Sequence, residues 1–364
     1  MYRHSLVLLV LVGAGLTLGC GGDRFVIGTK VAGSVETRLD APPVSTSAGP
    51  VKPVVVQNGG ARVALIDVDG LILNTPFVGP LSVGENPVAL FREKLDAVAC
   101  DPCVRAVVLR VNSPGGGVAA CIAMRRDLER FKACTRLPVV ACLMDTATGG
   151  AYYLASAADQ IVAGPATVTG GIGVILNLFN LRDLMLQFNV IPQPVMAGTK
   201  ADIGTSARKL TDGEKALLQS MADEFHAQLI RDIQQSRPGV VVRMETPFEG
   251  TLFGWCIDRG NTFDGRIFTG SQAKARNLVD QVGDLDDALH LAGQLGCPNQ
   301  NARPGVVMYR RGNDPARSVY AVTANVPLQG TGLFPSLPGL DRAKMPTFLS
   351  LWQPELSIEK LGGK

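Results

Sequence analysis

Two glycine-rich turns carry the residues of this chain that could do chemistry. The first turn is Arg110-Val-Asn-Ser-Pro-Gly-Gly-Gly117, and the second is Asp145-Thr-Ala-Thr-Gly-Gly-Ala-Tyr-Tyr153. Each turn lies between an apolar run typical of a strand and a helical pattern. Such a turn leaves backbone N–H groups pointing at whatever lies above it, which suits a developing oxyanion. The second turn lies where a nucleophile would stand, so the pair indicates hydrolytic chemistry.

The scarcity of histidine limits which base could serve that chemistry. A Ser-His-Asp triad needs a positioned imidazole. His226 and His290 both fall within amphipathic helical patterns, away from either glycine turn, and there is no His-Glu-x-x-His motif for zinc. If hydrolysis takes place here, a lysine has to act as the base, kept neutral by burial.

The elements that must position the turns alternate between strands and helices. We predict strands over residues 62–68, 106–111, 138–143 and 160–163, and helices over residues 86–98, 118–131 and 152–158. This alternation indicates an α/β domain with mostly parallel strand pairing. A longer helix is predicted from Thr211 to about Gln235, because Thr211 and Glu214 can form a capping box and Pro238 and Gly239 end the pattern.

The N-terminus has the features of a targeting segment. A positive start is followed by an apolar stretch over residues 5–18, which is shorter than the roughly 20 residues needed to span a bilayer. Leu16-Thr-Leu-Gly-Cys20 resembles a bacterial lipobox, in which Cys20 would be lipidated. Because Thr17 stands where leucine is commoner, a short uncleaved anchor or a plain secretory leader stays open. We therefore predict an exported protein of the bacterial cell envelope, tethered to the membrane as a lipoprotein.

The composition favours a folded body with flexible ends. Apolar residues make up 46% of the chain and charged residues 18%, and the formal net charge is +3, which argues against nucleic-acid binding. We predict a signal peptide over residues 1–20, a flexible stalk over 21–60, one main domain over 61–297 and a C-terminal extension over 298–364. The extension, which includes the apolar segment Leu349-Ser-Leu-Trp-Gln-Pro354, is expected to wrap the body or contact a partner.

The cysteines other than Cys20 indicate structural roles. Cys100 and Cys103 have redox spacing but lack a thioredoxin-like context, so a loop or a local disulfide is favoured. Cys121 and Cys142 lie in apolar stretches and are predicted to be small core residues.

Five motifs in order resemble the signal peptide peptidase family of the SppA type. They span roughly residues 61–296 and comprise Val111-Asn-Ser-Pro-Gly-Gly116, residues 147–159, Thr167-Val-Thr-Gly-Gly-Ile-Gly-Val174, Ala197-Gly-Thr-Lys200 with Leu210-Thr211, and residues 264–270 with 283–288. The resemblance implies the ClpP/crotonase-like fold, an α/β spiral of ββα units assembled as a homo-oligomer. It also implies peptidase chemistry by a Ser–Lys dyad formed across neighbouring subunits, acting on signal peptides or other short apolar peptides.

The family's catalytic positions fall on residues without the required side chains. By the resemblance, the nucleophilic serine corresponds to Gly149, the lysine to Ala201, and the serine that orients the lysine to Gly171. A hydroxyl and an amine stand one residue earlier, at Thr148 and Lys200.

Two interpretations follow from this register. In the first, one-residue insertions restore Thr148 as nucleophile and Lys200 as general base, with oxyanion donors at Gly115 or Gly116 and near Gly149. In the second, the site is inactive and the fold serves peptide binding or assembly. We favour the second, because one residue along a helix means about 1.5 Å and 100° of rotation, and a 1 Å error can cost about a hundredfold in rate. Thr148 could instead be the N-cap of the following helix.

A third class, a crotonase-like acyl-CoA enzyme, would also use glycine-turn oxyanion holes. Export argues against it, because coenzyme A is not expected outside the cytoplasm. The sequence shows no metal or cofactor motif. The predicted partners are therefore signal peptides or short apolar peptides, the membrane through a lipid anchor, and further copies of this chain.

Overall fold

The computed structural model describes residues 49–75, 78–79, 82–83, 85–242, 261–298, 303–311, 318–321 and 349–351. These residues all belong to one unit, Ser47–Lys364. Cys20 and the predicted signal peptide lie outside the described ranges. Within those ranges, we find no helix with the length and apolar character needed to cross a bilayer.

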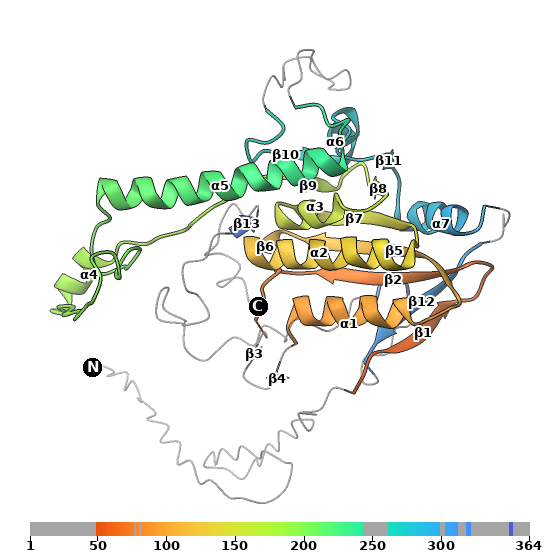
Figure 1. Cartoon of the computed structure of the whole chain (residues 1–364), viewed down its shortest axis with the longest axis horizontal. Coiled ribbons are helices and arrows are strands. Elements are labelled where there is room, and N and C mark those ends of the chain that lie inside the picture. The colour runs from red at the N-terminus through yellow and green to blue at the C-terminus, as the bar shows by residue number, and fades with distance from the viewer. Residues whose placement is uncertain are drawn as a thin grey trace, which may run out of the picture. The chain divides into compact units, whose positions relative to one another are not determined.

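A nine-stranded sheet organises the described part of the chain (Figure 1). Its strands are β1 (Lys52–Gln57), β2 (Arg62–Asp69), β5 (Val104–Ser113), β7 (Val139–Thr148), β8 (Gln160–Ala163), β9 (Val168–Gly170), β10 (Ile267–Thr269), β11 (Gln281–Val282) and β12 (Gly305–Arg310). The order is β1-β12-β2-β5-β7-β8-β11, with parallel pairing from β12 to β11 and an antiparallel β1 at the margin. The predicted α/β class with mostly parallel strands is confirmed.

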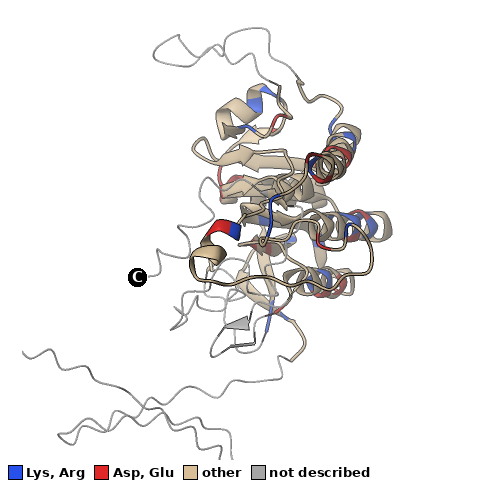
Figure 2. Ribbon diagram, turned by 90° about the vertical axis from the view of Figure 1, so that its left-hand side faces the viewer, with Lys and Arg blue, Asp and Glu red and all other residues tan. Residues whose placement is uncertain are grey.

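Helices cover both faces of this sheet, because successive strand residues point to opposite sides. Helices α1 (Pro87–Ala99), α2 (Val118–Thr135) and α3 (Gly150–Ala155) pack on one face, and α7 (Leu285–Gly296) packs on the other. In β2, for example, Ala64 and Ile66 belong to the first core cluster, whereas Val63 and Leu65 belong to the second. Figure 2 shows the charged residues gathered mainly on the helices, whereas the sheet between them is largely uncharged.

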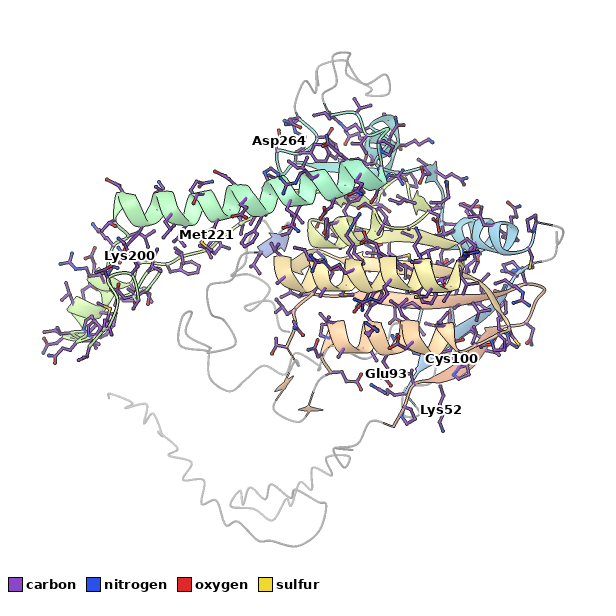
Figure 3. All side chains as sticks on the ribbon, viewed as in Figure 1. Lys52, Glu93, Cys100, Lys200, Met221 and Asp264 are labelled. Carbon is purple, nitrogen blue, oxygen red and sulfur yellow. The ribbon has the colours of Figure 1, made fainter. Side chains whose placement is uncertain are left out.

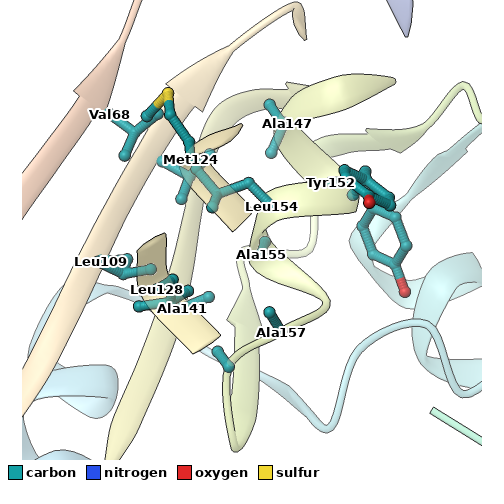
Figure 4. Packing of buried hydrophobic residues seen from close by; sticks show 14 of the residues in the cluster. Val68, Leu109, Met124, Leu128, Ala141, Ala147, Tyr152, Leu154, Ala155 and Ala157 are labelled. Carbon is teal, nitrogen blue, oxygen red and sulfur yellow. The ribbon is translucent and has the colours of Figure 1, made fainter. Parts of the chain in front are cut away.

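The larger core cluster fixes the helices that follow the two glycine turns. Figure 4 shows Met124 and Leu128 of α2 among side chains of the strands, including Leu109 and Ala141. All four side chains are at most 2% exposed. Because α2 and α3 both sit on this cluster, the turns that begin them are held in place by apolar burial of roughly 1.5–3 kcal/mol per large side chain.

Strand β7 changes partners along its length, and this places the second glycine turn. Residues 140–143 pair with β8, whereas Thr146, Ala147 and Thr148 pair with β9. Strand β9 in turn pairs antiparallel with β10. The end of β7 therefore stays in the sheet, between β9 and Ser113 at the end of β5, and leads directly into α3.

A long helix, α5 (Asp212–Ser236), begins and ends where the sequence predicts. Thr211 is its N-cap, and both hydrogen bonds of the capping box with Glu214 are formed. Residues 177–225, which we call the arm, include the short helix α4 (Arg182–Gln187), and none of the residues of α4 is buried. Figure 1 shows α5 projecting beyond the sheet with α4 near its far end.

Buried Arg125 of α2 fastens the other end of α5 to the body. Its guanidinium donates to the carbonyl oxygens of Tyr153 at 2.7 Å and Asp232 at 3.1 Å, and to the hydroxyls of Ser156 and Ser236. It also lies 4.7 Å from the ring centre of Tyr153. One cation therefore links α2, α3 and α5.

Two strands correct the predicted boundaries of the main domain. β1 lies within residues 21–60, where we predicted a flexible stalk, and β12 lies within the predicted extension 298–364. They pair with each other, and β12 also pairs with β2 inside the sheet. The β-branched run Val54-Val55-Val56 suits such pairing, but the partner is far away in sequence. The domain therefore includes residues on both sides of 61–297.

Smaller differences concern α3 and the cysteines. Helix α3 begins at Gly150, two residues before the predicted start, and residues 268–279 include the short helix α6 (Gly270–Ala275). Cys100 and Cys103 are free and exposed, so they form a loop rather than a disulfide. Cys121 and Cys142 are free and buried, as predicted.

Candidate functional site

The first glycine turn forms a short strand, β6 (Gly115–Gly117), that has no room for side chains on one edge. Gly115 has φ of 100°, a conformation that favours glycine. A Cβ on Gly116 would lie 1.9 Å from the carbonyl oxygen of Ile72. The N–H of Ile72 donates to the carbonyl oxygen of Gly115 at 2.9 Å. The carbonyl oxygen of Ile72 accepts from the N–H of Gly117, also at 2.9 Å. Glycine is therefore required at position 116 by the close approach of the Ile72 backbone, and is favoured at position 115 by its positive φ.

The second glycine turn places Gly149 at the sharp junction between β7 and α3. Gly149 has φ of 55° and ψ of −121° and is the N-cap of α3, without a side-chain capping bond. A sharp strand-to-helix turn of this kind is where a nucleophile projects in hydrolases that have one. Gly149 supplies no side chain there. Its N–H donates to the carbonyl of Gly170 at 2.8 Å, and so it is already engaged within the fold.

Thr148 joins the two turns through its side chain. It is completely buried, and its hydroxyl donates to the carbonyl oxygen of Pro114 at 3.1 Å. The structure assigns the N-cap of α3 to Gly149, so the hydroxyl of Thr148 does not cap that helix. A second hydroxyl, that of Ser113, accepts from the N–H of Gly115 at 3.1 Å. Of the predicted oxyanion donors, the N–H groups of Gly115 and Gly149 thus have partners in the fold, and Gly116 lies between the Ile72 backbone and Ser350.

A thiol lies directly beneath the second turn. A Cβ on Gly150 would come within 2.2 Å of Sγ of Cys121, so this sulfur touches the first turn of α3. Burial raises the pKa of the Cys121 thiol to about 12. Because only the thiolate is an effective nucleophile, Cys121 packs against the turn and does not replace the missing serine.

Lys200, the predicted base, lies on the arm. Figure 3 shows Lys200 and Met221 out on the projecting segment, away from the strands. The side chain of Lys200 is 54% exposed, and its ammonium lies 3.8 Å from the carboxylate of Glu214. Thr148 lies at the end of β7 in the body, so a single chain does not bring Thr148 and Lys200 together.

An arginine organises the arm around Lys200. Arg208 donates to both carboxylate oxygens of Asp202 at 2.5 and 2.7 Å, and to both of Glu214 at 2.7 and 2.8 Å. These hydrogen bonds hold the pKa of the Glu214 carboxyl well below its usual range, and they lower the pKa of Asp202 as well. The loop that carries Lys200 and Ala201 is therefore fixed at neutral pH, although it is distant from the glycine turns.

A segment from the C-terminal part of the chain occupies the free edge of β6. Strand β13 (Leu349–Leu351) pairs antiparallel with β6, with Ser350 opposite Gly116. On its other side, Leu349 and Ile175 exchange two backbone hydrogen bonds, of 2.8 and 2.9 Å. We call the position between β6 and Ile175 the strand site. An extended segment in this position forms backbone hydrogen bonds along both of its edges.

The side chain at the centre of the strand site is small and fully enclosed. Ser350 is 0% exposed, and its hydroxyl has no hydrogen-bond partner among the described residues. Its carbonyl oxygen would lie 2.1 Å from a Cβ on Gly115 and 3.2 Å from a Cβ on Gly150. The Ser350 carbonyl therefore rests between the two glycine turns, beside the junction at Gly149.

Sequence reasoning located both turns but missed what completes the strand site. Ile72 and Ile175, which supply backbone groups, carry no signal in their side chains. The segment around Ser350 was predicted to wrap the body or to contact a partner, without a place in the site. Its alternation of leucine, serine and leucine is the one sequence feature that indicates a short strand.

Comparison with known proteins places these observations in a family. The model of peptidase family S49 matches residues 132–247, which include the second turn, the arm and most of α5. Residues 132–247 are therefore similar to peptidase family S49, and we call this matched part of the chain the S49 domain. The resemblance to signal peptide peptidases is thereby confirmed. The substitution of the family's catalytic residues by Gly149, Ala201 and Gly171 stays a prediction.

Relatives of the S49 domain carry protease names. The chain is 32% identical to a putative protease of Methanocaldococcus jannaschii over 215 residues, which are 59% of this chain and 63% of the relative. It is 30% identical to protease 4 of Salmonella typhi over 236 residues, 65% of this chain and 35% of the relative. A putative signal peptide peptidase SppA of Enterococcus faecium is 27% identical over 228 residues, 63% of this chain and 62% of the relative. The chain thus spans less than two thirds of each.

Among solved structures, the chain is similar to the 1510-N membrane-bound stomatin-specific protease. The TM-score is 0.38 at 13% identity, covering 62% of this chain and 82% of that one.

Proposed function

We propose that this protein binds extended peptides, at a membrane outside the cytoplasm, without cleaving them by a Ser–Lys dyad. The observation that carries the proposal is the strand site, in which an extended segment pairs on both sides beside a turn whose central residue, Gly149, has no side chain. Binding of this kind takes its affinity from main-chain hydrogen bonds and its selectivity from enclosed side-chain positions.

The chemistry at the turn supports binding rather than hydrolysis. Acyl transfer needs a hydroxyl that faces the scissile carbonyl, with a base within hydrogen-bond reach. Thr148 is buried and already donates to Pro114. Lys200 is half-exposed on the arm, and its ammonium lies 3.8 Å from the carboxylate of Glu214. Within one chain, neither side chain is placed as a nucleophile or a general base requires.

The expected ligands are peptides that carry a small residue between apolar ones. The central position of the strand site encloses Ser350 completely, so a larger side chain there would have to displace its neighbours. Signal peptides combine an apolar stretch with small residues at their cleavage site. Remnant signal peptides and other short apolar peptides therefore fit the site.

The arm supports assembly of several copies of the chain. Large apolar side chains on it are exposed, and Phe188 reaches 73% and Ile191 64%; the others include Phe179, Leu184, Leu186 and Val195. Clusters of exposed apolar side chains are typical of protein–protein interfaces. We propose that the arm packs on a second copy of this chain, and that lipidated Cys20 tethers the assembly to the membrane.

A second candidate function is hydrolysis in which the two groups come from different copies. It is favoured by the place of Thr148, one residue before the junction, and by the arm, which carries Lys200 away from the site of its own chain. Thr148 would have to exchange its hydrogen bond to Pro114 for one to the lysine of a neighbour.

The experiment that separates the two functions measures binding and turnover with the same peptides. Protein lacking residues 1–23 is assayed with fluorescent and quenched apolar peptides, beside Thr148→Ala, Lys200→Ala and the matched control Lys209→Ala, an exposed lysine on the same loop. We expect saturable binding without turnover in all four proteins. Turnover that is lost in Thr148→Ala and Lys200→Ala but kept in Lys209→Ala would establish the second function instead.

A further inference from the structure

We propose that Leu349–Leu351 is a resident ligand of the strand site, so that the C-terminal segment of the chain competes with any peptide that enters. The proposal rests on the proposed function, because it concerns the same site. It assigns a role to a segment that is remote in sequence from both glycine turns.

The backbone contacts of β13 are those of a bound peptide. Leu349 exchanges both of its hydrogen bonds with Ile175, and the antiparallel register with β6 sets Leu349, Ser350 and Leu351 opposite Gly117, Gly116 and Gly115. The edge of β6 facing Ile72 is already used. An incoming peptide therefore has the same single edge available to it and cannot pair with β6 until β13 leaves.

The burial of the Ser350 side chain is a second, independent observation in favour of a resident ligand. Ser350 is fully buried, with its carbonyl between Gly115 and Gly150. Its hydroxyl has no hydrogen-bond partner among the described residues, so an alanine would fill the position equally well. What the position requires is small size, and the chain supplies a small residue from its own C-terminal part.

The covalent connection gives this ligand an advantage over free peptides. Residues 319 and 321 accept hydrogen bonds from the buried side chain of Arg110, so the C-terminal part is fixed to the body shortly before it continues toward β13. A tethered ligand acts at an effective concentration on the order of millimolar. With an intrinsic Kd of about 0.1 mM or lower for the segment itself, any free peptide would bind the occupied site at least about tenfold more weakly than the open site.

Disulfide trapping tests the occupancy without any need for peptide binding or activity. A hydrogen-bonded antiparallel pair has Cα atoms about 5.5 Å apart, which lies within the range that a disulfide spans. We expect Ile175→Cys with Leu349→Cys to form an intrachain cross-link under mild oxidation, identified by peptide mapping and by migration as a monomer. The matched control, Phe179→Cys with Leu349→Cys, should not form it. A cross-link between chains, or none, would overturn the proposal.

Release of the segment tests the competition. Ser350→Asp places a carboxylate in an enclosed position without a partner, which disfavours the bound state. With a fluorescein-labelled peptide copying residues 346–354, the full chain carrying Ser350→Asp should bind at least about tenfold more tightly than the unchanged chain. Ser350→Ala should bind like the unchanged chain, and so should Ser357→Asp, the same substitution elsewhere in the tail. Equal binding by Ser350→Asp and the unchanged chain would refute competition. If the cross-link forms but no variant binds peptide, the occupancy stands and the proposed function fails.

Discussion

The strand site and the arm are opposite arrangements within one chain. In the strand site, backbone packs on backbone so closely that a Cβ on Gly115 would lie 2.1 Å from the carbonyl oxygen of Ser350, and an enclosed serine fills the centre. On the arm, large apolar side chains such as Phe188 are mostly exposed. The difference teaches that the strand site is filled within one chain, whereas the apolar surface of the arm, which also carries Lys200, is left open by its own chain.

The largest effect should come from adding a methyl group to the strand site. In Gly116→Ala the new Cβ would meet the carbonyl of Ile72 at 1.9 Å, so backbone must shift on one side or the other. We expect the free energy of unfolding to fall by about 3 kcal/mol or more. The measurement is chemical denaturation followed by circular dichroism.

The neighbouring glycine provides the matched control for that substitution. A Cβ on Gly117 meets only ordinary contacts, of which the nearest is Leu73 at 3.6 Å. Gly117→Ala should therefore cost less than about 1 kcal/mol, mainly through its weaker N-cap preference. Equal losses in the two variants would show that Ile72 does not limit the turn.

The connection between body and arm should show the next largest effect. Arg125→Met removes the donor that satisfies the carbonyl oxygens of Tyr153 and Asp232, and we expect a loss of about 2–4 kcal/mol together with looser attachment of α5. Denaturation gives the first quantity, and hydrogen exchange in residues 226–236 gives the second. The exposed neighbour provides the control, since Arg126→Met should change stability by no more than about 0.5 kcal/mol. An unchanged exchange rate in Arg125→Met would mean that α5 is held by apolar packing alone.

Acid should loosen the arm before it affects the strand site. Hydrogen bonds from Arg208 hold the pKa values of Glu214 and Asp202 below their ordinary values of 4.5 and 3.8. Groups with lowered pKa values stabilise the fold above their ordinary pKa and lose that contribution as pH falls through the folded value. Hydrogen exchange in residues 198–214, corrected for its intrinsic rate, should therefore be slow at pH 7 and rise progressively below about pH 4.5. Arg208→Met should exchange rapidly at both pH values, and a pH response that persists in this variant would contradict the assignment.

The smallest effect on stability should come from polar substitutions on the arm. Phe188 and Val195 are mostly exposed, so replacing both by serine should change the free energy of unfolding by less than about 0.5 kcal/mol. The same change should reduce the oligomer to smaller species in light scattering at micromolar concentration. An oligomer of unchanged mass would place the subunit interface elsewhere. The exposed pair Lys209→Ser and Lys215→Ser controls for surface substitution on the same segment.

The sequence predicts the elements that local pattern specifies. The strands ending at the two turns and helix α5 lie where the apolar periodicity and the Thr211–Glu214 capping box indicate. Strands β1 and β12 were assigned to a stalk and an extension because their pairing partners are far away in the chain. Short runs of this kind acquire a structure only from the partner strand.

The candidate site was predictable in its turns but not in its occupant. Glycines 115 and 149 mark backbone geometry that glycine adopts most easily, Gly116 marks a close approach of backbone, and this signal is local. The docking of Ser350 against Gly116 joins residues more than two hundred positions apart, through backbone groups that carry no sequence signature. The position of Lys200, on an arm that projects away from the glycine turns, likewise has no local signature in the sequence.

The hydrogen bond from Thr148 to Pro114 has a mechanical consequence. It ties the end of β7 to the loop that leads into β6, so the two turns cannot separate without breaking it. Insertion of a peptide strand against β6 would therefore strain the far turn as well. The methyl group of Thr148, packed in the interior at this joint, would serve as a natural nuclear magnetic resonance reporter of whether the strand site is filled.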